Sequence, residues 1–185
     1  MNNLIITTVY KDSEVSFARA HNDRYGDKLR IVSDLKLDFG NVWPVPDSNK
    51  FTVEWTKRFL RLFLNETEFD GLLKIDPDTT IRDLPLIPDC DVAGDFRKSD
   101  VGWLWLGGFQ FFTKHAVNQI LNDSLYTGNC VFQDVELAKS IQRLNLKAYN
   151  LENIDCWNLT NDQNLLVYHP GKSKIKGLQS GFVTF

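Results

Sequence analysis

The sequence has few of the features that mark secreted, membrane or nucleic-acid-binding proteins. Its three cysteines show no Cys-x-x-Cys spacing, which argues against a disulfide framework and a structural zinc site and favours a reducing, cytoplasmic environment. The net charge of −3 gives no electrostatic case for binding nucleic acid, which needs a basic stripe. No apolar run approaches the roughly 20 residues of a membrane span, and segment 4–10 is too short and threonine-rich for a signal-peptide core.

The rest of the composition is that of an ordinary globular domain. Hydrophobic residues make up 43% and charged residues 24% of the chain, and 185 residues are enough for one domain with a full core. The chain has no repeats, low-complexity tracts or linker. We therefore expect one domain over residues 1–171, followed by a glycine- and lysine-containing tail over residues 172–185.

Periodic apolar positions predict strands that alternate with helices. The clearest helix begins at Thr52, because Trp55, Phe59 and Phe63 recur at helical spacing. The proline-containing segment 35–50 is predicted as a loop. The expected strands are 4–10, 29–32, 72–75, 91–96, 103–112, 147–151 and 165–168, and the expected helices are 13–25, 52–65, 113–121 and 133–144. The alternation predicts an α/β fold, a single Rossmann-like domain whose mostly parallel central sheet has helices on both faces.

An acidic pair follows the central predicted strand. The apolar run 72–75 is typical of a buried strand, and Pro77 should end it because proline cannot donate to a strand ladder. Asp76 and Asp78 then lie at the strand end, where two close carboxylates repel each other unless a cation lies between them. A divalent cation there could hold a diphosphate. The alternative is a plain turn, in which aspartates cap their own backbone.

Polar side chains follow three of the predicted strands. Tyr10 ends the first, Asp34 follows the second, and Asp76 and Asp78 follow the central one. Open parallel sheets bind ligands at the carboxyl ends of their strands. The convergence of three strand ends therefore predicts one binding site.

The acidic pair is also found in phosphatases of the haloacid-dehalogenase type. Their nucleophile motif is a strand followed by Asp-x-Asp-x-Thr, which residues 76–80 match, and Asp95 with Asp100 resembles their second acidic motif. Those motifs belong on neighbouring parallel strands, which need a long, usually helical crossover. Here the intervening segment holds two prolines and no predicted helix, and the motif lies deep in the chain rather than at its start.

A second resemblance covers the chain from Leu4 to His169. Over this range the sequence resembles the GT-A class of nucleotide-sugar glycosyltransferases, particularly the galactosyltransferase-like and glycogenin-like groups. The matching stretches, in the order that the class has them, are 5–10, 55–60, 73–79, 106–112, 133–138 and 168–172. This resemblance implies transfer of a hexose from a nucleoside-diphosphate sugar, a UDP-sugar, to a hydroxyl of a saccharide or other acceptor.

The resemblance also implies a metal site with the Asp-x-Asp motif. Asp78 would bind the ion directly, Asp76 would bind it through water or accept from the ribose hydroxyls, and His169 would be the third ligand. Mixed carboxylate and imidazole ligands suit Mn²⁺ better than Mg²⁺. The alternative for His169 is a histidine beside a turn proline.

Further residues would hold the donor. The end of the first strand, with Thr8 and Tyr10, would contact the nucleotide base, Asp34 would accept from base or ribose, and Gly107 and Gly108 would lie beside the donor sugar. Each has an alternative: Tyr10 is a core residue with its hydroxyl in water, Asp34 is a cap, and the glycine pair marks a bulge.

Asp134 is the expected catalytic base, because an acceptor hydroxyl becomes a nucleophile when a carboxylate takes its proton. The alternative is that Asp134 only stabilises a helix start. Gln133 departs from the class, whose inverting members usually have glutamate at this position. A third possibility beside transferase and phosphatase is a non-catalytic domain that binds nucleotide-sugar or glycan without turnover.

Overall fold

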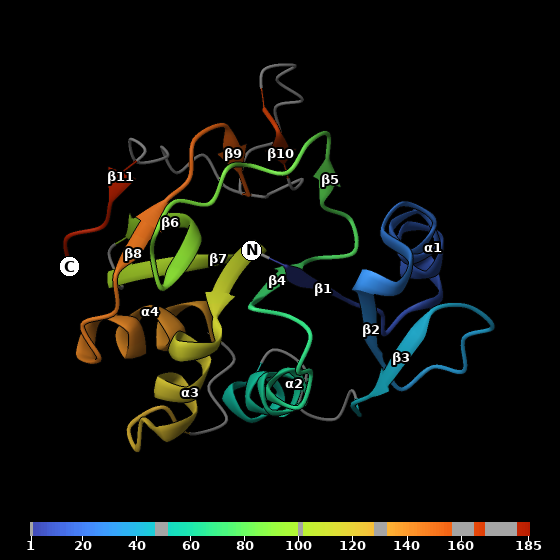
Figure 1. The fold of residues 1–185 in the computed structure, drawn as a ribbon, viewed down its shortest axis with the longest axis horizontal. Coiled ribbons are helices and arrows are strands. Elements are labelled where there is room, and N and C mark those ends of the chain that lie inside the picture. The colour runs from blue at the N-terminus through green and yellow to red at the C-terminus, as the bar shows by residue number, and fades with distance from the viewer. Residues whose placement is uncertain (1, 47–51, 100–101, 128–132, 157–164, 169–180) are drawn as a thin grey trace.

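The computed structural model describes residues 2–46, 52–99, 102–127, 133–156, 165–168 and 181–185. The strands of its main sheet are β1 (Asn3–Thr8), β2 (Leu29–Ser33), β3 (Asn41–Pro44), β4 (Gly71–Ile75), β6 (Val92–Ser99), β7 (Gly102–Thr113), β8 (Ala148–Asn150) and β11 (Gly181–Phe182). Their spatial order is β11-β8-β6-β7-β4-β1-β2-β3 (Figure 1). A smaller sheet contains β5 (Thr80–Ile81), β10 (Val167–Tyr168) and β9 (Ile154–Asp155), in that order.

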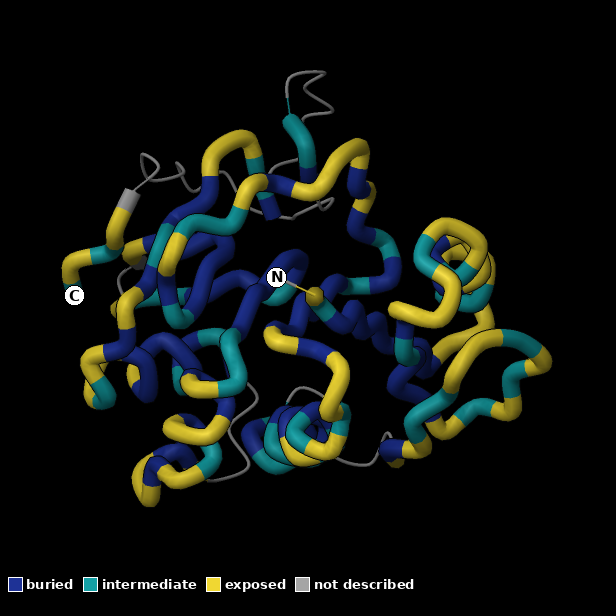
Figure 2. Tube along the Cα trace, in the orientation of Figure 1, coloured by how far each residue is buried: buried dark blue, intermediate teal, exposed yellow. Residues whose placement is uncertain are grey.

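The helices lie on both faces of the main sheet. They are α1 (Asp12–Tyr25), the 3-10 turn η1 (Gly26–Lys28), α2 (Val53–Leu64), α3 (Lys114–Asn122) and α4 (Gln133–Arg143). One face packs against α2, α3 and α4, and the opposite face packs against α1 and the small sheet (Figure 1). Side chains alternate between the faces, so Leu72 joins the first core and Leu73 the second. Figure 2 shows the central strands buried and the outer turns of α1 exposed.

The main sheet is mixed, with more parallel than antiparallel pairs. The pairs β1–β2, β1–β4, β2–β3 and β6–β8 are parallel, whereas β4–β7, β6–β7 and β8–β11 are antiparallel. The predicted fold class is confirmed: the described residues form a single Rossmann-like α/β domain. The strand β7 is antiparallel to both of its neighbours and separates β4 from β6.

Local sequence signals explain the two best-defined helix starts. Thr52 caps α2 by accepting a hydrogen bond from the backbone N–H of Trp55 at 3.2 Å. Thr113 caps α3 in the same way, accepting from Ala116 at 3.1 Å. A threonine oxygen at this position satisfies a backbone donor that the helix leaves without a partner. The predicted apolar stripe of α2, Trp55, Phe59 and Phe63, is buried as expected.

Two segments of the main sheet differ from the elements expected from the sequence. Residues 41–44, expected in a loop, form β3 at the edge of the sheet, where Pro44 does not interrupt a central ladder. Near the end of the chain, residues of the expected tail form β11, which pairs with β8. The ring of Phe185 also packs against Phe96 and Trp103. Residues 181–185 are therefore part of the domain rather than an appendage to it.

No helix in the described ranges combines the length and apolarity needed to cross a membrane.

Candidate functional site

The candidate site lies at the carboxyl ends of β1 and β4. At this point the order in which strands are added to the sheet reverses. From β1 the chain builds outward through β2 and β3 on one side, whereas β4 pairs with the other side of β1. Open α/β sheets bind ligands in the crevice at such a switch point. Thr7 pairs with Ile75, so the next residues, Thr8 and Asp76, are neighbours at this edge.

The acidic pair lies on a tight turn directly after β4. The backbone N–H of Thr79 donates to the carbonyl of Asp76 at 3.0 Å, which closes a β-turn with Pro77 in its second position, the position that proline favours. Both carboxylates, those of Asp76 and Asp78, are partly exposed, whereas Pro77 and Thr79 are buried. The predicted strand end is therefore followed by a tight turn whose two aspartates are partly exposed.

A bulge in β7 holds this turn in place. Gly94 pairs with Gln110 and Phe96 with Trp105, so β7 carries additional residues between these two pairs. Within the bulge, the carbonyl of Gly108 accepts from the Asp76 backbone N–H at 3.3 Å and from the Thr79 hydroxyl at 2.9 Å. The glycine pair predicted beside the donor sugar therefore contacts the acidic turn directly.

Three functional groups converge at Gly107. A Cβ atom added to Gly107 would lie 3.0 Å from the Lys74 ammonium, 3.5 Å from a carboxylate oxygen of Asp134 and 3.5 Å from one of Asp76. Asp76 and Asp134 are thus brought to the same point although they lie in different elements, the turn after β4 and the first turn of α4. The absence of a side chain at Gly107 leaves room for these charged groups.

Lys74 is a functional candidate that the sequence reasoning missed. The side chain is 1% exposed, and its ammonium donates to a carboxylate oxygen of Asp76 and to the carbonyl of Gly107, the latter at 2.7 Å. The sequence did contain a signal for this role, because Lys74 interrupts the apolar run 72–75 and lies two residues before Asp76. Residues two apart point to the same face of a strand.

Helix α1 contacts the acidic turn and lies on the face of the sheet opposite to α2, α3 and α4. His21 is buried, and its Nε2 lies 3.1 Å from the carbonyl oxygen of Pro77, to which it donates. Burial lowers the pKa of His21, and the nearby charge of Arg24 lowers it further, although the bond to Pro77 opposes both. Arg24 itself donates to the carbonyls of Ile81 and Arg82, the latter at 2.9 Å. One face of α1 therefore anchors the segment that follows β4.

The start of α4 is held against α2 by a buried hydrogen bond. The Thr56 hydroxyl donates to the side-chain oxygen of Gln133 at 2.5 Å. Asp134 follows Gln133 in the first turn of α4, where the helix dipole stabilises a carboxylate. The two roles weighed for Asp134 are therefore compatible, because a helix-start aspartate here also faces Asp76 across Gly107.

Other predicted binding residues lie elsewhere around the switch point. The Tyr10 ring is 7% exposed and packs against Trp55; its hydroxyl accepts from the Trp55 indole at 2.6 Å and donates to the Val45 carbonyl at 3.0 Å. This arrangement favours the core alternative for Tyr10, with the hydroxyl bonded to protein rather than to water. Thr8 is buried and Asp34 is exposed just after β2. The predicted metal ligand His169 lies outside the described residues.

Asp95, from the second acidic motif of the phosphatase alternative, lies in a buried ion-pair network, and Asp100 of that motif lies outside the described residues. Asp95 is 3% exposed and forms a two-pronged ion pair with Arg97, at 2.9 and 2.8 Å. Arg97 also donates to Asp155 at 2.7 Å, and the Cys156 backbone N–H donates to Asp95 at 2.8 Å. Because β7 separates β4 from β6, the two acidic motifs are not on neighbouring strands.

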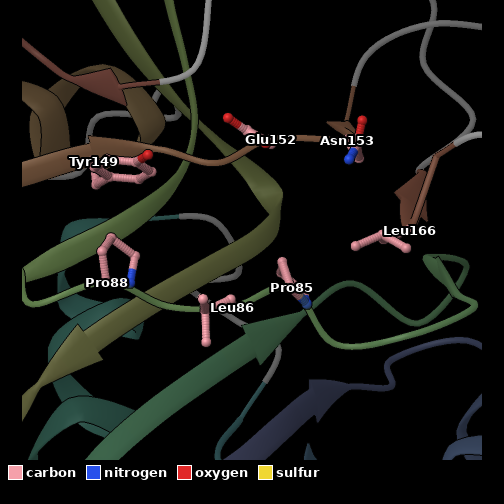
Figure 3. Close-up of a pocket in the computed structure, with 7 residues that line it drawn as sticks. All are labelled: Pro85, Leu86, Pro88, Tyr149, Glu152, Asn153 and Leu166. Carbon is pink, nitrogen blue, oxygen red and sulfur yellow. The ribbon is translucent and has the colours of Figure 1, made fainter.

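A pocket of about 290 Å³ lies on the side of the small sheet. Its lining residues come from the proline-containing segment after β5, from β8 and its following turn, and from the residue before β10 (Figure 3). They include Pro85, Leu86, Tyr149, Glu152 and Leu166, and none of the lining residues is one of the site residues predicted from the sequence.

The groups present fit a divalent cation in part. Carboxylate oxygens such as those of Asp76 and Asp78 are the ligands that Mg²⁺ and Mn²⁺ take, and Gly107 keeps the space beside Asp76 clear of a side chain. Within the described residues, no group of three or more histidine, cysteine or acidic side chains is close enough to hold a metal ion. A complete ligand set would therefore need a further donor, such as water, the diphosphate or the predicted His169.

The fold and the site together define a Rossmann-like α/β domain with an acidic turn at its switch point. No protein-family model matches the chain, and no curated protein matches it.

Proposed function

We propose that this protein is a metal-dependent glycosyltransferase that transfers a hexose from a nucleoside-diphosphate sugar, a UDP-sugar, to a hydroxyl of an acceptor such as a saccharide. One observation carries the proposal. Asp76, predicted to serve the metal and nucleotide, and Asp134, predicted to be the base, approach the same point at Gly107. That point lies at the switch point of the sheet, where this class of fold binds its ligands.

The cation would be held by Asp78 and Asp76, with His169 as the third protein ligand. When bound, it would stabilise the negative charge that develops on the departing diphosphate. Mn²⁺ is the expected ion, with Mg²⁺ as the alternative.

The protein's own residues would position the reactants and move one proton. The acceptor oxygen attacks the anomeric carbon of the donor, the bond from that carbon to the diphosphate oxygen breaks, and the nucleoside diphosphate leaves. Asp134 accepts the proton of the acceptor hydroxyl. Lys74 and Gly107 hold Asp76 beside Asp134, and the Gly108 carbonyl fixes the turn that carries Asp76 and Asp78.

Calorimetry with UDP, with and without Mn²⁺, tests this proposal. We expect UDP to bind in the presence of Mn²⁺ and to bind at least tenfold more weakly after Asp78→Asn, because the diphosphate is then held without its metal bridge. The matched control is Asp83→Asn, an exposed aspartate in the same segment, which should leave binding unchanged. UDP binding that is absent, or that is indifferent to Mn²⁺, would contradict the proposal.

The two alternatives predict different results in the same preparation. A non-catalytic binding domain would bind UDP with Mn²⁺ but show neither transfer nor hydrolysis of a UDP-sugar. A phosphatase would hydrolyse a phosphate ester and lose that activity after Asp76→Asn.

A further inference from the structure

Lys74 occupies an unusual position for a lysine. It is the next-to-last residue of β4 and its side chain is 1% exposed, and lysine is almost never fully buried unless it is paired. Its two acceptors are the carboxylate of Asp76 and the carbonyl of Gly107. The ammonium therefore lies between the acidic turn and the bulge of β7 and donates a hydrogen bond to each.

The charge of Lys74 alters what the acidic turn offers to a cation. An ammonium bonded to Asp76 cancels the charge of that carboxylate, so a divalent ion meets less negative charge than the Asp-x-Asp pair suggests. The ammonium cannot withdraw into water, because it is buried and bonded to Gly107. A diphosphate would bring the missing negative charge, since its oxygens can bind the ion and face the lysine at the same time.

We propose that Lys74 is a positioning residue that neutralises Asp76, so that a divalent cation binds this site tightly only together with a nucleoside diphosphate. The inference rests on the proposed function for the identity of the diphosphate. Its electrostatic part concerns the chain alone: the ammonium opposes uptake of a bare cation. Cation and nucleotide would then bind as a pair.

Binding of Mn²⁺ alone, measured by electron paramagnetic resonance, tests the electrostatic part. Lys74→Met keeps the length of the side chain and removes its charge, and it should raise the affinity for Mn²⁺ without nucleotide by about tenfold. Lys74→Arg keeps the charge and should leave that affinity low. A merely structural role predicts the opposite, because a disturbed strand would bind Mn²⁺ more weakly. Affinity in Lys74→Met that is equal to or below that of the wild type, including no binding in either, overturns the proposal.

A second comparison serves if Lys74→Met does not fold, as judged by circular dichroism. Lys74→Gln also removes the charge and keeps a donor for the Asp76 carboxylate and the Gly107 carbonyl, and it should likewise raise the affinity for Mn²⁺ without nucleotide. An affinity in Lys74→Gln that is no higher than that of the wild type overturns the proposal.

The proposed function and this inference fail separately. If the wild type binds no UDP with Mn²⁺, the proposed function fails, while the response of bare Mn²⁺ affinity to Lys74→Met still decides the role of the lysine. If UDP binds with Mn²⁺ and Lys74→Met leaves the affinity for bare Mn²⁺ unchanged, only the inference about Lys74 fails.

Discussion

Gly107→Ala tests the convergence at the switch point most sharply among single substitutions. The new methyl group would lie 3.0 Å from the Lys74 ammonium and 3.5 Å from carboxylate oxygens of Asp76 and Asp134. Its closest contact is the far end of a flexible side chain, so the lysine can yield by a few tenths of an ångström. We expect a loss of about 1 kcal/mol in the free energy of unfolding, at the low end for overpacking, and a fall in Tm of about 2–4 °C.

The effect on chemistry should exceed the effect on stability. Small displacements of catalytic groups reduce rates steeply, and this substitution moves an ammonium that holds one of the two carboxylates. We expect Gly107→Ala to reduce turnover of a UDP-sugar donor about tenfold, measured as release of UDP with Mn²⁺ present.

Gly71→Ala is the matched control. Gly71 is the first residue of β4, whereas the candidate site lies at the carboxyl end of this strand. A Cβ there would lie 2.6 Å from both the Phe111 ring and the Asn3 side-chain oxygen, a core clash that should cost about 3 kcal/mol and about 6–12 °C in Tm. The folded fraction should keep its turnover. If Gly107→Ala is as active as the wild type, or if both variants lose activity only in proportion to unfolding, the reasoning about Gly107 is refuted.

Three further predictions concern the groups around the site. Asp134→Asn should keep Mn²⁺-dependent UDP affinity in calorimetry and lose transfer by at least a hundredfold, the usual range for loss of a general base; retained transfer would remove Asp134 from the mechanism. Arg97→Met should cost about 3–5 kcal/mol in urea unfolding, because it leaves Asp95 buried without its cation; a loss below about 1 kcal/mol would contradict the network. Because burial holds the pKa of His21 below its ordinary value of 6.5, the unfolded chain binds more protons as pH falls below that value, and stability falls with it. His21→Gln, which keeps a donor for Pro77, should lose less stability than the wild type between about pH 7 and 5.5 in urea unfolding; equal losses would exclude His21 as a source of this pH dependence.

Elements with strong local patterns could be predicted from the sequence. The helical spacing of Trp55, Phe59 and Phe63 predicted α2, and the structure confirms it. The apolar run ending at Pro77 predicted β4 and its end point in the same way. These signals are readable because burial of one helix face or of a whole strand imposes its own period on the sequence.

Strand pairing was beyond local reasoning. Pro44 favoured a loop, but an edge strand tolerates proline because its outer donors need no partner, and the sequence alone does not say which strand lies at the edge. The antiparallel insertion of β7 between β4 and β6 depends on contacts between distant segments. The sequence pattern of a strand is the same whichever neighbour it pairs with.

The residues of the candidate site also fall into two groups, those that a local sequence pattern indicates and those that depend on contacts between distant segments. Asp76, Asp134 and Gly107 were named from the sequence, and the structure brings them to one point. Lys74 could have been found from the two-residue period of a strand. His21 could not, because its role depends on how α1 lies over the turn at Pro77.

The central claim is that a divalent ion at the end of β4 holds the diphosphate of an activated sugar. A crystal soaked with UDP and Mn²⁺ tests it directly, because Mn²⁺ gives an anomalous signal. The account predicts an anomalous peak within coordination distance, about 2.1–2.3 Å, of an oxygen of Asp78 and next to the UDP diphosphate. A peak elsewhere, or UDP bound away from the carboxyl ends of β1 and β4, would contradict it.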